Sequence, residues 1–140
     1  MYDDKVDRYN YISIIFFLLP IISSIYHKCE LFLLLNCIVL TTGFSYHMVL
    51  KIYKKTTPLI NFLRLLDIFA VHSVISYIFY YSVYSNLYTI LSVILVSGIL
   101  VFYYKFSEIY YHSYIHILGS IAMLCSINSC QINLKNCHMC

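Results

Sequence analysis

Residues 87–104 read LYTILSVILVSGILVFYY, a run of eighteen positions without a single charged side chain. A helix rises 1.5 Å per residue, and roughly 17 to 20 apolar residues are enough to cross the hydrocarbon core of a bilayer. The stretch therefore predicts a transmembrane helix. How often the same pattern recurs along the chain decides the fold class.

The pattern recurs from one end of the chain to the other. Apolar stretches lie at about 11–26, 31–50, 59–84, 87–104 and 109–128. The first is short and contains Pro20, so we expect it to be kinked or partly interfacial. The sequence predicts an all-α, multi-pass transmembrane helical bundle of about five spans. We expect residues 1–140 to form a single membrane domain with a Cys-containing tail at 129–140.

The composition points to the same class of protein. The chain is 61% hydrophobic and 11% charged, whereas a soluble domain carries about a quarter charged residues. The net charge of +3 is small and the basic residues lie between apolar runs, so nucleic acid is not an expected partner. Three aspartates near the start, Asp3, Asp4 and Asp7, argue against a cleaved signal peptide. We expect a multi-pass integral membrane protein with lipid as its partner, and the sequence leaves the membrane in question open.

Lysine and arginine residues predict the orientation. If five spans alternate, the side of the membrane opposite the N-terminus carries only Lys28 and Lys135. The side of the N-terminus carries seven of the nine Lys and Arg residues: Lys5, Arg8, Lys51, Lys54, Lys55, Arg64 and Lys105. Because cytoplasmic loops are enriched in Lys and Arg, the N-terminus is predicted to be cytoplasmic and the C-terminus outside or lumenal.

Four ionisable residues fall at one depth near the cytoplasmic side. His47 closes the second stretch, Asp67 opens the third, and His112 and His116 open the last. A carboxylate in lipid costs roughly 2.5 to 3.5 kcal/mol unless a partner compensates it. Histidines four residues apart share a helix face, and with His47 they could form the three-histidine site of a catalytic zinc. Asp67 would then orient the bound water or take its proton. The alternative is a set of interfacial histidines satisfied by head groups or backbone carbonyls.

Three segments resemble the CREST superfamily of membrane proteins, which includes alkaline ceramidases, progestin and adiponectin receptors and hemolysin III-like proteins. They are SYHMVL around His47, LRLLDIFAV around Asp67, and HSYIHILGSIAML around the last pair of histidines. The resemblance covers roughly residues 31–128 in outline. It implies zinc held by His47, His112 and His116, with Asp67 linked through water as the acid/base partner.

The chain departs from that family pattern in two ways. Gly43 stands where the family has a serine. Five spans replace the usual seven, so we expect the helices to enclose a substrate cavity less completely. The resemblance implies a zinc-dependent lipid amide or ester hydrolase, ceramidase-like. One alternative is a non-enzymatic receptor-like or membrane-remodelling protein of the same ancestry, favoured by both departures. Another is a bis-histidine haem protein that uses His47 and one histidine of the last stretch.

Several further residues have weaker signals. We expect His72 to be a packing residue with a hydrogen-bonded ring, or to face a different neighbour from Asp67. The tail sequence CHMC has zinc-knuckle spacing but lacks a second matching pair, so a reduced tail and disulfides both stay open. The tail cysteines are Cys125, Cys130, Cys137 and Cys140.

Overall fold

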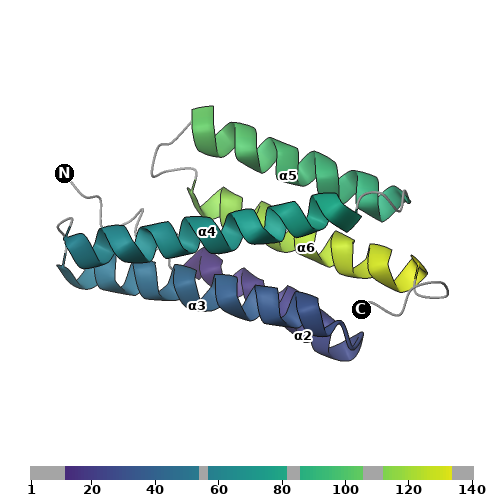
Figure 1. Cartoon of the computed structure of the whole chain (residues 1–140), viewed down its shortest axis with the longest axis horizontal. Coiled ribbons are helices and arrows are strands. Elements are labelled where there is room, and N and C mark those ends of the chain that lie inside the picture. The colour runs from purple at the N-terminus through teal and green to yellow at the C-terminus, as the bar shows by residue number, and fades with distance from the viewer. Residues whose placement is uncertain (1–11, 54–56, 82–85, 106–111, 134–140) are drawn as a thin grey trace.

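The protein is a bundle of helices (Figure 1). The computed structural model describes residues 12–53, 57–81, 86–105 and 112–133, and this part of the chain contains no strand. The elements are the 3₁₀ helix η1 (Ile14–Phe17) and the α-helices α2 (Leu18–Tyr26), α3 (Glu30–Tyr53), α4 (Pro58–Tyr81), α5 (Leu87–Lys105) and α6 (His112–Asn133). The predicted all-α fold is confirmed.

Four helices within the described residues, α3 to α6, are long and apolar enough to span a membrane. The chain is thus a multi-pass membrane protein, as predicted. The N-terminal apolar helix is shorter, with 4 residues in η1 and 9 in α2. That is below the roughly 17 residues that a full crossing needs.

Local sequence sets several of the helix ends. Pro58 is the first residue of α4, and Thr57 before it accepts a hydrogen bond from the Ile60 backbone N–H through Oγ1 at 3.3 Å. Proline at the first position and threonine at the N-cap are both favoured there. Asn86 caps α5 in the same way, because its Oδ1 accepts from the Thr89 N–H at 3.0 Å.

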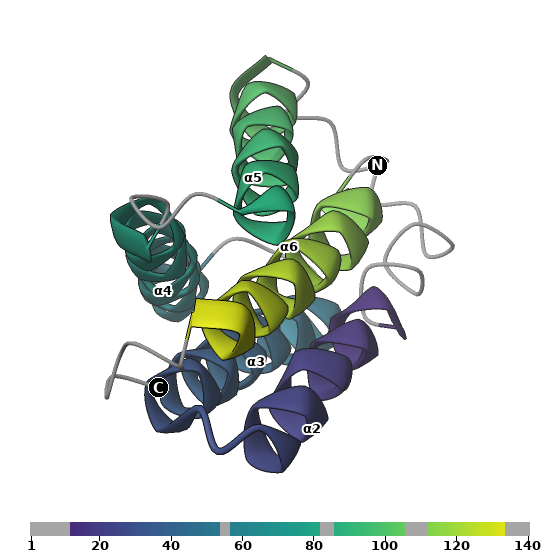
Figure 2. The same cartoon turned by 90° about the vertical axis from the view of Figure 1, so that its right-hand side faces the viewer.

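Two helix pairs form most of the bundle. α3 packs mainly on α4, α5 packs mainly on α6, and the N-terminal helix lies against both α3 and α6. Figure 2 looks along the bundle and shows α5 and α2 on opposite sides of α6. Large apolar side chains such as Leu65 and Phe69 on α4 are exposed, 65% and 73% respectively. Such outward apolar faces suit lipid rather than water.

Hydroxyl side chains join α5 to α6. The Oγ atoms of Ser92 and Ser126 lie 2.6 Å apart, and Ser92 also donates to the Ala122 carbonyl at 3.0 Å. One turn nearer the start of α5, Thr89 Oγ1 contacts Ser129 Oγ. Small polar residues allow close approach of membrane helices and hydrogen-bond across their interface, which explains why α5 pairs with α6.

A hydrogen bond from α6 reaches the N-terminal helix beside its proline. Pro20 has no backbone N–H to give the Phe16 carbonyl, four residues earlier, and that carbonyl instead accepts a backbone N–H at the end of the 3₁₀ turn. Ser120 Oγ donates to that carbonyl oxygen at 2.8 Å. Since Ser120 is 1% exposed, no water has to enter the interface. This hydrogen bond fixes the N-terminal helix against the start of α6.

Candidate metal centre

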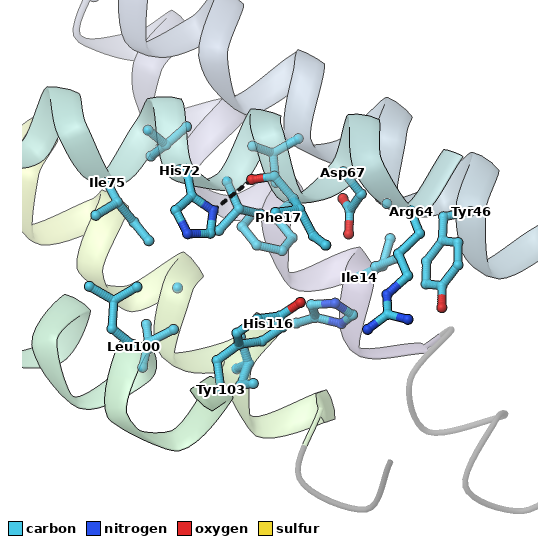
Figure 3. A pocket seen from close by; sticks show the side chains of 18 of the residues that line it. Ile14, Phe17, Tyr46, Arg64, Asp67, His72, Ile75, Leu100, Tyr103 and His116 are labelled. Carbon is cyan, nitrogen blue, oxygen red and sulfur yellow. Dashed lines mark hydrogen bonds between the residues drawn. The ribbon is translucent and has the colours of Figure 1, made fainter. Parts of the chain in front are cut away.

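A cavity of about 530 Å³ lies among α3, α4, α5 and α6, and Ile14 and Phe17 of the N-terminal helix also line it. Its volume is in the range of small-molecule sites, roughly 300 to 1,000 Å³. Most of the lining is apolar. Figure 3 shows polar and charged side chains at one end and Ile75 and Leu100 toward the other. The polar lining residues are Tyr46, His47, Asn61, Arg64, Asp67, His72, Tyr103, Tyr104 and His116.

Two of the three predicted zinc ligands meet in this cavity. The rings of His47 on α3 and His116 on α6 contact each other edge to face, with centroids 5.3 Å apart. Both residues are buried, at 4% and 7% exposure. Two imidazoles that bind one zinc at 2.0–2.1 Å in tetrahedral geometry have centroids roughly 5 Å apart. The separation therefore fits a shared ion.

The ring of His116 is held in place by the N-terminal helix. Ser13 Oγ lies 2.7 Å from Nδ1 of His116, and the Phe17 ring packs against the imidazole edge to face at a centroid distance of 6.0 Å. A hydrogen bond at one ring nitrogen fixes the tautomer and orientation of a metal-binding histidine. A ring held through Nδ1 would bind metal through Nε2.

The Asp67 carboxylate faces α3. Thr42 Oγ1 donates to Asp67 Oδ1 at 3.2 Å. A Cβ atom added at Gly43 would lie 3.2 Å from the same oxygen and 3.3 Å from Cδ1 of Ile14. Gly43 thus adjoins the carboxylate, and the neighbouring Thr42 supplies a hydroxyl group to it.

His112 is the first residue of α6, and its side chain lies outside the described part of the structure. Among the side chains that are described, no group of three or more His, Cys, Asp or Glu residues is placed to hold a metal ion. The donors present are the imidazoles of His47 and His116, with the carboxylate of Asp67 on the same cavity. Imidazole nitrogen and carboxylate oxygen are ligand types that zinc prefers, but these three side chains do not converge on one point, so a complete zinc site would need a further ligand such as His112.

His72 lines the cavity but uses both ring nitrogens elsewhere. Nδ1 lies 2.8 Å from the Ile68 carbonyl oxygen, and Nε2 lies 3.2 Å from the Tyr104 hydroxyl group. A carbonyl only accepts, so Nδ1 carries the proton, and Nε2 of the neutral ring accepts from Tyr104. These bonds agree with the packing role expected from the sequence.

Sequence reasoning missed Ser13 and Thr42. Ser13 is 103 residues from His116, and no spacing rule connects the two. Thr42 offered a signal, because it is a hydroxyl side chain one turn before His47 in an apolar run.

The cysteines among the described residues do not line the cavity. Cys29, Cys37 and Cys125 are free, whereas Cys130 is disulfide-bonded. Burial raises the pKa of the Cys29 thiol, which makes the reactive thiolate scarcer. Cys137, His138 and Cys140 lie outside the described residues.

A scan against protein-family models, a search of curated proteins and a search of solved structures each found no match to this chain.

Proposed function

We propose that this chain is a zinc-dependent integral membrane hydrolase of the CREST type that cleaves the amide or ester bond of a lipid. One observation carries the proposal. His47 and His116, which are on different helices, bring their rings to 5.3 Å at the polar end of a largely apolar cavity. That combination of paired buried imidazoles and an apolar chamber suits a reactive centre for a lipid acyl group.

His47, His116 and the neighbouring His112 would hold the ion. Zinc, when bound, supplies Lewis acidity toward the acyl carbonyl and a water molecule with a pKa of about 7. Among the described residues, Asp67 has a hydrogen bond at Oδ1 only, from Thr42. Oδ2 of Asp67 would therefore take the proton from the attacking water and pass it to the leaving nitrogen or oxygen.

The apolar part of the cavity would bind the acyl chain. Val39, Val74, Ile78 and Val96 line it and are buried. Apolar walls exclude water from the chain and leave the acyl bond at the polar end.

Metal content of the detergent-purified protein tests the first half of the proposal. We expect about one zinc per chain, and its loss in His47→Ala, His112→Ala and His116→Ala. His72→Ala is the matched control and should keep its zinc, because both nitrogens of that ring are already hydrogen-bonded. A folded His116→Ala protein with full zinc content would reject the site.

Release of fatty acid from a panel of N-acyl and O-acyl lipids tests the second half. A zinc-loaded protein that releases none would favour the second candidate, a non-enzymatic receptor-like or membrane-remodelling protein. Gly43 is the observation that favours this candidate, since it removes the serine hydroxyl group from beside Asp67. The haem alternative would need His47 and one histidine of α6 to hold a porphyrin between them, and the contact between the rings of His47 and His116 does not favour that pair. A haem absorption band in the purified protein would revive it.

A further inference from the structure

We propose that the cavity binds a single-chain lipid with an anionic head group, and that Arg64 binds that head group. This inference deepens the proposed function by assigning the charge of the lipid, and it rests on that function only in taking the cavity as the lipid site.

Arg64 belongs to the cavity face of α4. Ile60, Arg64, Asp67 and Val71 are spaced three or four residues apart, which places them on one side of the helix, and all four line the cavity. In the view of Figure 3 the Arg64 side chain extends from α4 toward the end that holds Tyr46 and His116. The guanidinium group thus belongs to the polar end of the chamber.

Nothing in the described part of the chain neutralises this cation. No hydrogen bond or ion pair to Arg64 is present there. Asp67 is one turn away on the same face, but its Oδ1 atom is turned to Thr42 and the Gly43 position on α3. Arginine keeps its charge at any physiological pH, and a charge at membrane depth requires a partner. Arg64 is six residues from the start of α4, or roughly 9 Å along the helix.

The order of residues along α4 predicts the arrangement of the ligand. Arg64 comes first, Asp67 is one turn further, and the buried apolar residues Val74 and Ile78 follow. A lipid bound in this order has its anionic head at Arg64, its acyl bond near Asp67 and the two histidines, and its chain beyond. The planar fork of arginine pairs two hydrogen bonds with a carboxylate or a phosphate. An N-acyl amino acid and a monoacyl glycerol phosphate both place such a group a few atoms from an acyl bond.

The competing explanation is that Arg64 extends to the head groups of bulk lipid, as long cationic side chains often do. Bulk head groups would not make ligand binding inside the cavity depend on charge. A pair of probes that differ in the head group alone separates the two explanations.

The experiment measures binding of N-palmitoylglycine and of its neutral analogue N-palmitoylethanolamine to the full-length protein in detergent. Monopalmitoyl glycerol phosphate supplies a phosphate head, and N-acetylglycine supplies the anion without the chain. The variant is Arg64→Gln. The matched control is Lys51→Gln, because Lys51 is an exposed cation in the last turn of α3 that does not line the cavity.

We expect the wild-type protein to bind the anionic lipids at least tenfold more tightly than N-palmitoylethanolamine. A tenfold difference in affinity is typical of the loss of one charge-assisted hydrogen bond. Arg64→Gln should abolish this preference and keep its affinity for the neutral lipid, which also shows that the cavity is intact. Lys51→Gln should retain the preference.

Three results would overturn the inference. The first is equal affinity of the wild-type protein for the charged and neutral lipids, and the second is an equal loss of affinity for both lipids in Arg64→Gln. The third is that N-acetylglycine displaces a bound lipid as effectively as N-palmitoylglycine does, which would indicate a site for free anions. Selective binding without release of palmitate would leave the inference standing and reject the proposed hydrolysis instead.

Discussion

The hydrogen bond between Ser13 and His116 is the contact on which the geometry of the candidate site depends most. Removing a hydrogen-bonded partner of a metal-binding histidine typically costs 10- to 100-fold in metal affinity. We therefore expect Ser13→Ala to weaken zinc binding by roughly that factor, measured by titration against a chelator of known affinity.

Ser24 provides the control for this prediction. It is another buried serine of the N-terminal helix, and its Oγ has no hydrogen-bond partner among the described residues. Ser24→Ala should leave zinc affinity unchanged. Equal zinc affinity in Ser13→Ala and wild type would show that the serine does not orient the ring.

Two glycines make opposite predictions about stability. A Cβ at Gly43 would meet Asp67 Oδ1 at 3.2 Å and Ile14 at 3.3 Å, whereas a Cβ at Gly98 on α5 would have no neighbour within 4 Å. Gly43→Ala should cost about 1 to 3 kcal/mol of unfolding free energy, as overpacking does. Gly98→Ala should gain about 0.5 to 1 kcal/mol, because alanine restricts the unfolded chain.

Thermal unfolding of both variants in one detergent measures the difference. An unfolding temperature for Gly43→Ala at or above that of Gly98→Ala would contradict the close approach of α3 to Asp67.

At the scale of single residues, the sequence could single out ionisable side chains in apolar runs but could not predict which of them touch. His47 and Asp67 stand out because an ionisable group is rare and costly in an apolar run. The hydrogen bond from Thr42 to Asp67 depends on how α3 and α4 are rotated against each other. That rotation is set by packing of the whole interface and leaves no trace in the spacing of polar residues.

At the scale of helices, the apolar runs predicted most of the architecture. In lipid every backbone N–H and C=O must bond within the segment, so an apolar run of sufficient length forms a helix almost regardless of its residues. The ends were harder to predict. α6 continues to Asn133, beyond the expected end at 128, since polar side chains there have hydrogen-bond partners within the helix and on the turn before α3. Asn128 donates to the Leu124 carbonyl at 3.0 Å, and Gln131 donates to the His27 carbonyl at 2.9 Å.

The hydrogen bond from Ser120 to the turn that contains Pro20 predicts a coupling between two helices. Ser120→Ala leaves the Phe16 carbonyl with its backbone donor alone, which should cost about 0.5 to 1.5 kcal/mol, the net value of one hydrogen bond. In a Pro20→Ala background the restored backbone N–H can serve the same carbonyl. The cost of Ser120→Ala should then be markedly smaller.

A double-mutant cycle of unfolding free energies measures this coupling. Additive effects of the two substitutions would mean that the Ser120 hydroxyl group and the backbone N–H at position 20 do not compete for the Phe16 carbonyl.

At the scale of the whole molecule, the cavity forms despite the small number of helices. The sequence led us to expect a less complete enclosure than seven spans give, and the cavity of about 530 Å³ among α3 to α6 is partly open. The reason is the pairing, because α3 with α4 and α5 with α6 pack closely while the two pairs touch little. The N-terminal helix bridges α3 and α6 and carries Ser13 to the site. Sequence alone could not give this arrangement, since it follows from contacts more than 100 residues apart.

Orientation in the membrane is a property of the whole molecule that follows from its cations. Lys51 and Lys105 lie in the last turns of α3 and α5, whereas Lys28 lies in the turn between α2 and α3, at the opposite end of α3. The positive-inside rule places the end with Lys51 and Lys105, and with it the candidate site, at the cytoplasmic face. Exposed Tyr26 and Tyr53 mark the two ends of this part of the bundle, at 81% and 57% exposure. In sealed membrane vesicles with the cytoplasmic face inside, a membrane-impermeant maleimide should label Tyr26→Cys above the wild-type background, and Tyr53→Cys only after permeabilisation. The reverse pattern would place the histidines at the outer face and contradict the assignment.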